Sequence, residues 1–181
     1  MYQILILLKF TMKFKLFLVL SIISIVSFGQ KNNIDVYKTS EYFIEFPKSW
    51  ELKKSEQKGV EFILFSSKQK VDPFRENISL VIQDLEKDMT LESYIEVTES
   101  QLRNMMKGTS VQENVYDKIN QRHTLVYIVN ISASYLKVKQ HFYKRGNKMY
   151  TLTFTALQKS YDDYKKIADG VLNSFKFIPT K

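Results

Sequence analysis

Three long β-rich runs follow one another closely in the second half of the chain, and they constrain its fold more than any other feature. The runs cover residues 122–131, 135–144 and 148–156. Only short, turn-prone segments join them, so they are expected to pair as consecutive antiparallel hairpins. Shorter runs of the same kind lie at residues 42–46, 60–65, 77–85 and 175–178. An antiparallel sheet is therefore expected at the centre of the fold.

Two amphipathic helices are predicted, one before and one after the three long runs in the sequence. The first is capped by Thr90 and ends at Gly108, and its apolar residues recur at helical spacing. They are Leu91, Tyr94, Ile95, Thr98, Leu102, Met105 and Met106. The second opens with Ser160 and Asp163, a variant of the capping box, and Gly170 inside it suggests close approach to a neighbour. Its apolar face comprises Tyr164, Ile167, Ala168, Val171, Leu172 and Phe175.

The order of these elements, strands then helix then strands then helix, predicts an α+β fold. The central antiparallel β-sheet is flanked by two main α-helices whose apolar faces cover it. The register of the last hairpin is less obvious. A two-residue turn at Gly146-Asn147 would place Lys139 opposite Phe154 and so mix polar with apolar faces. We therefore predict a three-residue loop that pairs Lys144 with Lys148 and aligns the apolar residues, since a slip of one residue inverts every side chain.

This register places one row of polar and aromatic side chains on the solvent face of the sheet. The row contains Tyr127, Tyr135, His141 and Tyr143, and it is the predicted interaction surface because tyrosine is enriched at protein interfaces. The same register makes His123 and His141 diagonal neighbours on one face, and two imidazoles with a carboxylate could bind Zn, Cu or Ni. No third ligand follows from the spacing, so no metal site and no cofactor are predicted.

Residues 12–30 have the three parts of a secretory signal peptide. Lys13 and Lys15 precede an apolar run of thirteen residues, 16–28, and Ser27-Phe28-Gly29 forms a small-x-small cleavage site. Cleavage would remove residues 1–29 and leave Gln30 at the new N-terminus. The run is shorter than the ~20 residues that a membrane-spanning helix needs. The positive charge ahead of the apolar run also favours Met12 as the true start, since residues 1–11 add a second apolar stretch that no signal peptide requires.

The predicted mature chain, residues 30–181, has the length of one domain. Three lysines leave with the signal peptide, so the formal net charge falls from +8 to +5, and the remaining basic residues are scattered among acidic ones. No nucleic-acid partner is expected from this pattern. The chain contains no cysteine, which excludes disulfides and a lipid anchor on a cysteine.

Common catalytic motifs are absent from the sequence. There is no G-x-S-x-G, no H-E-x-x-H, no glycine-rich phosphate loop and no thiol nucleophile. Spacing alone does not test a Ser/His/Asp triad, whose members meet in space. The prediction is that the protein is not an enzyme.

Several segments together resemble the PsbP-like family, and the resemblance spans residues 36–178 in order. The segments are YFIEFPKSW (42–50), RENISLV (75–81), TLESY (90–94), YTLTFTA (150–156) and ADGVLNSF (168–175). Among its members, the chain is most similar to short exported PsbP-related proteins of the Bacteroidetes and to DcrB-like envelope proteins. The resemblance implies a central antiparallel sheet with helices on its faces, as in the Ran-binding Mog proteins, and binding without catalysis.

Two functions remain open at this stage. The first is an exported, non-catalytic accessory or adaptor protein of the cell envelope, periplasmic or extracellular, that binds an unknown partner protein. The alternative is a carrier that holds a small hydrophobic ligand or lipid in a pocket between helix and sheet. A monomer is expected, although the sequence does not determine the oligomeric state.

Overall fold

The computed structural model describes residues 33–68, 74–105, 108–131 and 133–179. The chain divides into two compact units, Met1–Ile34 and Asp35–Lys181, and the fold below is that of the second. The predicted signal peptide, residues 1–29, lies outside the described residues. Met106 and the side chain of Met105, both assigned above to the first helix, also lie outside them.

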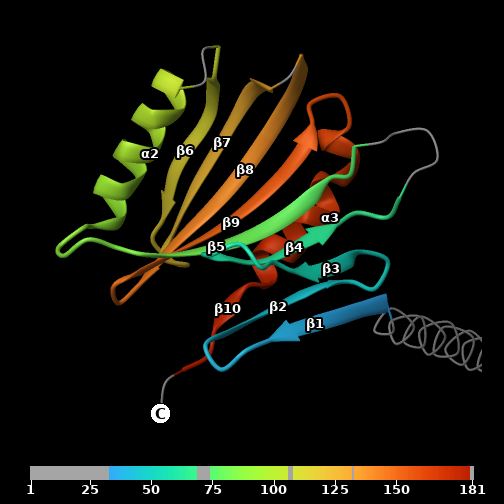
Figure 1. The fold of residues 1–181 in the computed structure, drawn as a ribbon, viewed down its shortest axis with the longest axis horizontal. Coiled ribbons are helices and arrows are strands. Elements are labelled where there is room, and N and C mark those ends of the chain that lie inside the picture. The colour runs from blue at the N-terminus through green and yellow to red at the C-terminus, as the bar shows by residue number, and fades with distance from the viewer. Residues whose placement is uncertain (1–32, 69–73, 106–107, 132, 180–181) are drawn as a thin grey trace, which may run out of the picture. The chain divides into compact units, whose positions relative to one another are not determined.

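The described residues form two antiparallel sheets and two helices (Figure 1). The large sheet has seven strands in the order β3-β4-β5-β9-β8-β7-β6, and a small sheet has the order β1-β2-β10. The elements are β1 (Ile34–Lys38), β2 (Tyr42–Pro47), β3 (Glu51–Lys54), β4 (Val60–Phe65), β5 (Asn77–Asp84), α2 (Leu91–Met105), β6 (Ser110–Asp117), β7 (Arg122–Ile131), β8 (Ser134–Arg145), β9 (Lys148–Leu157), α3 (Tyr161–Ser174) and β10 (Lys176–Phe177). The predicted α+β class with a central antiparallel sheet is confirmed. The strands at both ends of the domain form their own small sheet and do not join the central one.

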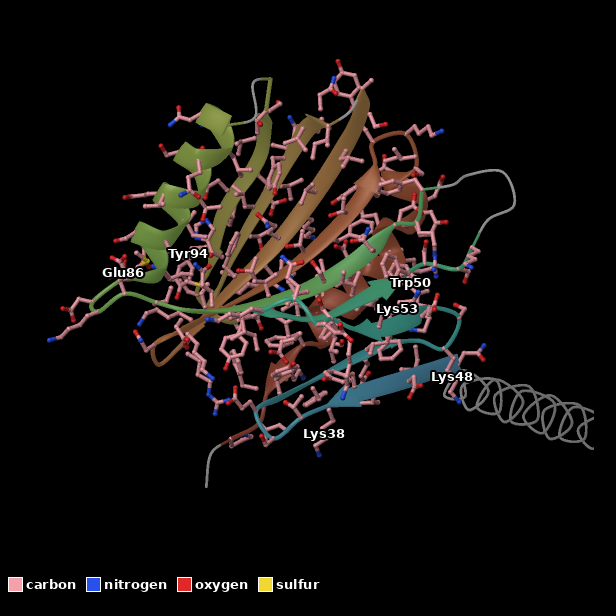
Figure 2. All side chains as sticks on the ribbon, viewed as in Figure 1. Lys38, Lys48, Trp50, Lys53, Glu86 and Tyr94 are labelled. Atoms are coloured by element: carbon pink, nitrogen blue, oxygen red, sulfur yellow. The ribbon has the colours of Figure 1, made fainter. Side chains whose placement is uncertain are left out.

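The large sheet buries apolar side chains on both of its faces. On one face, α3 and β2 cover the centre of the sheet, where Phe62, Leu80, Leu152 and Phe154 are almost fully buried. Trp50, labelled in Figure 2, joins this cluster and meets the ring of Tyr164 on α3 edge to face. The two-sided burial means that no strand face of the sheet centre is free to serve as a surface.

The second cluster lies under α2, on the opposite face of the large sheet. Leu91 and Ile95 of α2 pack there against Leu125, Phe142 and Met149. Tyr94, which Figure 2 shows on the side of α2 that faces the sheet, lies with its ring centre 6.0 Å from that of Phe142. The predicted core-facing stripe of this helix is therefore correct at these positions.

The hairpin between β8 and β9 has the register that the sequence analysis rejected. Its turn is the two-residue Gly146-Asn147, and Arg145 pairs with Lys148. Lys139 lies directly opposite Phe154. Gly146 has φ +58°, as the first central residue of a type II′ turn requires. The prediction of a three-residue loop was wrong because it assumed that one face of the sheet is solvent-exposed.

Four local predictions for the helices have different outcomes. The Thr90 side chain accepts a hydrogen bond from the Ser93 backbone N–H, as expected of an N-cap. The Ser160 side chain makes no capping bond and donates to Glu76 instead, at 2.6 Å, so the predicted capping box is absent. On α3, Ile167 is 43% exposed, and a Cβ at Gly170 would meet nothing within 4 Å, so neither residue packs as predicted.

Candidate functional site

The four residues of the predicted interaction surface do not form an exposed row. Only Tyr135 is exposed, at 58%, whereas Tyr127, His141 and Tyr143 are buried. Tyr127 pairs directly with Val138, so it points toward α2, while His141 and Tyr143 lie on the face covered by α3. The prediction was wrong for these three residues because helices cover both faces of the sheet.

The two histidines also lie on opposite faces. His123 is paired with Phe142, and His141 is paired with Thr124, so the pleat turns the two imidazoles away from each other. His123 bonds to Asn114 and stacks on Tyr116, near α2. The predicted diagonal contact was therefore wrong. Within the described residues, no group of three His, Cys, Asp or Glu side chains has the arrangement to hold a metal ion.

His141 belongs to a buried polar network at the end of the large sheet. Arg122, the first residue of β7, donates from Nη1 to Asn173 at 2.6 Å and lies 3.4 Å from His141 Nδ1. Its Nη2 donates to Asp117 at 3.1 Å, while its buried Nε has no partner. Because a guanidinium can only donate, Nδ1 must be the acceptor, and the imidazole proton sits on Nε2. The ring also donates to the backbone of Leu172.

This environment keeps the imidazole neutral. Burial is the largest effect, and the positive charges of Arg122 and Lys139 add to it, so the pKa of His141 falls to about 3. Lys139, two residues earlier on the same face, is paired with Asp169 of α3 at 2.7 Å. Despite the desolvation of Asp169, hydrogen bonds from Lys139 and Lys165 hold the pKa of this carboxyl below its usual value. Polar side chains of β8 are thus matched by partners from α3.

A pocket of about 570 Å³ opens beside this network, where the sheet end meets the end of α3. It is the candidate functional site. Its lining comes from the β6–β7 turn, the ends of β7, β8 and α3, and the segment around β10. The lining residues are Asn120, Gln121, Arg122, Tyr143, Lys144, Arg145, Asn173, Phe175, Lys176, Phe177, Ile178 and Pro179. Four of them are cationic and none is acidic.

Sequence reasoning missed this site, although part of the signal was present. Arg122 begins one long strand, and Lys144 and Arg145 end the next, so antiparallel pairing alone brings these three cations to the same sheet end. The incorrect register predicted for the β8–β9 hairpin placed the candidate residues on a strand face instead. The contributions of Asn173 and Lys176 have no local signal, because they depend on where α3 ends against the sheet.

The fold and the site together define a class of protein: an α+β domain whose antiparallel sheet is covered on both faces, with a cationic pocket at one end of the sheet. The family model for PsbP matches residues 32–177. The chain therefore belongs to the PsbP family. The comparison with curated proteins found no match.

Solved structures with the same fold come from organisms that are distant from one another. The cyanobacterial PsbP, CyanoP, of Synechocystis sp. PCC 6803 is 16% identical with a TM-score of 0.61, covering 83% of this chain and 96% of its own. LpqN, described as involved in cell envelope biogenesis of Mycobacterium tuberculosis, is 14% identical with a TM-score of 0.60 and coverages of 83% and 94%. The Saccharomyces cerevisiae Ran-binding protein Mog1p is 9% identical with a TM-score of 0.56 and coverages of 80% and 95%. At these identities the likeness shows the fold alone.

Proposed function

We propose that this protein is an exported accessory protein of the cell envelope that binds a partner protein and does not itself catalyse a reaction. The signal-like segment at residues 12–30 supports export to the periplasm or the cell exterior. Among the described helices, none combines the length and apolarity required to cross a bilayer. Two proteins of the same fold carry descriptions that suit this role, since LpqN is linked to envelope biogenesis and Mog1p binds Ran.

The observation that carries the proposal is the open edge of the large sheet at β6. This strand is the last in the sheet order, and within the described residues only β7 pairs with it. Val115 on the strand is 52% exposed, Tyr116 is 41% exposed, and Ile119 in the following turn is 93% exposed. An edge strand with exposed apolar side chains is a template for an extended segment of another protein. The partner is therefore proposed to add a strand beside β6.

Site-specific photo-crosslinking in the native host tests this surface. A photoreactive p-benzoylphenylalanine at position 115 or 119 is expected to give one discrete adduct with an envelope protein. The same substitution at Val97 is the matched control, because Val97 is 48% exposed but lies on the outer face of α2. Equal adducts from position 97, or none from positions 115 and 119, would contradict the proposed docking edge. Ile119→Lys should remove the adduct formed from position 115.

N-terminal sequencing of the material recovered outside the cytoplasm tests export separately. The expected first residue is Gln30, and a chain that retains Lys13 and Lys15 would contradict cleavage.

The alternative function, carriage of a small hydrophobic ligand between helix and sheet, has less support. Buried side chains fill the interfaces under both α2 and α3.

A further inference from the structure

We propose that the pocket at the end of the large sheet binds a small ligand that carries a carboxylate or phosphate group on an apolar body. The proposal does not depend on the docking edge at β6. Its first basis is charge: the lining contains Arg122, Lys144, Arg145 and Lys176 and no acidic residue. Like charges gathered around one concave surface raise the local concentration of an anion.

Three of these four cations keep an unneutralised charge. Arg122 is paired with Asp117, so its charge is compensated and its role is to order the pocket floor. Arg145 donates to the backbone oxygens of Glu41 and Ile178, at 3.0 and 2.9 Å, which fixes the guanidinium without cancelling its charge. Within the described residues, neither Lys144 nor Lys176 is within ion-pair distance of a carboxylate. A ligand anion would therefore meet the fixed Arg145 guanidinium and the exposed ammonium groups of Lys144 and Lys176, of which Lys144 also lines a neighbouring pocket beside Glu92.

Two features of the structure oppose the binding of an anion at this pocket. The Glu41 carboxylate lies near Arg145, but it accepts a hydrogen bond from Tyr150 and faces Lys148 in the neighbouring pocket. The negative end of the α3 dipole also points toward the site, but this effect falls off within the last turn of the helix. The last carbonyls of α3 are already engaged, since Val171 accepts from Ser174 and Leu172 from His141. The three cations therefore dominate the potential.

The second basis is the apolar part of the lining. Phe177 lies under the Arg145 guanidinium at 4.9 Å, and its ring meets those of Tyr143 and Phe175. The pocket volume of about 570 Å³ is in the range that holds a drug-sized molecule and far exceeds that of a lone phosphate ion. Aromatic rings beside cations suit a ligand with both an apolar and an anionic part.

Titrations followed by amide NMR test the proposal on the purified protein. Phenyl phosphate and benzoate are expected to shift the amides of residues 120–121, 144–145 and 176–178 selectively. Benzamide, the neutral counterpart of benzoate, should leave them unchanged. Inorganic phosphate should bind at least tenfold more weakly than phenyl phosphate, because it lacks the apolar body. Comparison with dihexanoyl phosphatidylglycerol below its micellar concentration shows whether a soluble anion or a lipid headgroup is preferred, and saturable binding of either at this pocket supports the site.

Matched charge variants distinguish the effect of the pocket cations on binding from the effect of the net surface charge. Lys144→Gln with Lys176→Gln should weaken phenyl phosphate binding about tenfold, while leaving the remaining spectrum in place because both side chains are exposed. Lys58→Gln with Lys87→Gln removes the same charge from exposed positions that do not line the pocket and should change nothing. Equal weakening by both pairs, equal binding of benzamide, equal affinity for inorganic phosphate, or no selective shifts would each overturn the proposal.

Discussion

The stability of the protein between pH 7 and pH 5 should depend on His141. Its pKa is lowered to about 3 in the folded state, whereas an unfolded chain returns it to the ordinary 6.5. Between the folded pKa of about 3 and the unfolded pKa of 6.5, the unfolded state binds a proton that the folded state does not. The stability contribution of His141 is therefore full above pH 6.5 and decreases as the pH falls. The two pKa values imply a loss of about 2 kcal/mol on going from pH 7 to pH 5.

Urea unfolding at pH 7, 6 and 5 measures this loss, and His141→Gln removes its source. The variant should be less stable at pH 7, because it loses part of the network with Arg122 and Leu172. Between pH 7 and pH 5 it should lose about 2 kcal/mol less than the parent protein. Burial also lowers the pKa of His123, so both measurements belong in a His123→Gln background. The carboxyl groups with lowered pKa values begin to lose their contribution only near pH 5 and lose most of it below that pH. An unchanged pH dependence in the His141→Gln variant would refute the reasoning.

Three further substitutions test local energetics by thermal or urea unfolding. Gly170→Ala should stabilise α3 by about 0.5–1 kcal/mol, since an added Cβ meets nothing within 4 Å; a destabilised variant would mean that close packing had been missed. Asp169→Asn should cost about 1–3 kcal/mol because it leaves the mostly buried Lys139 ammonium without its partner. Arg103→Gln, which breaks an exposed ion pair, should cost at most about 0.5 kcal/mol; equal costs for these two charge variants would contradict the role of burial.

The sequence predicts β2, β4, β5, β10, the three hairpin strands and both helices, because each carries its own local signal, but it gives no prediction for β1, β3 and β6. The strand runs before and after Pro73, the three hairpin strands and both helices lie where their periodicity places them. Thr90 identifies the start of α2 through a contact that spans only three residues. Such contacts are encoded locally, so they can be inferred without knowing the tertiary structure.

The assignment of faces fails for a physical reason that the β8 strand illustrates. Lys137, Lys139 and His141 share one side of the strand, and Leu136, Val138 and Phe142 lie on the other, which is the usual pattern of a strand with one solvent-facing side. In the structure this side is covered, and each polar group meets a partner that is distant in the sequence. Lys139 pairs with Asp169, thirty residues away, and the Lys137 ammonium lies 4.4 Å from the centre of the Tyr161 ring. No local pattern distinguishes a polar side chain in water from one that α3 neutralises.

The candidate pocket arises from the same cause. Polar groups under α3 are matched along the helix, but the helix ends at Ser174, and the strands that it covers continue into their turns. Beyond that end, no carboxylate of the helix neutralises Lys144 or Lys176. Arg122, at the end of the helix, is still held by hydrogen bonds to Asn173 and Asp117. A surplus of positive charge therefore collects where the cover of the sheet stops. If this reasoning is correct, Asn173→Asp should reduce phenyl phosphate binding, as the two lysine substitutions do. The variant places a carboxylate of α3 against Arg122 at the pocket floor and so neutralises part of the positive charge.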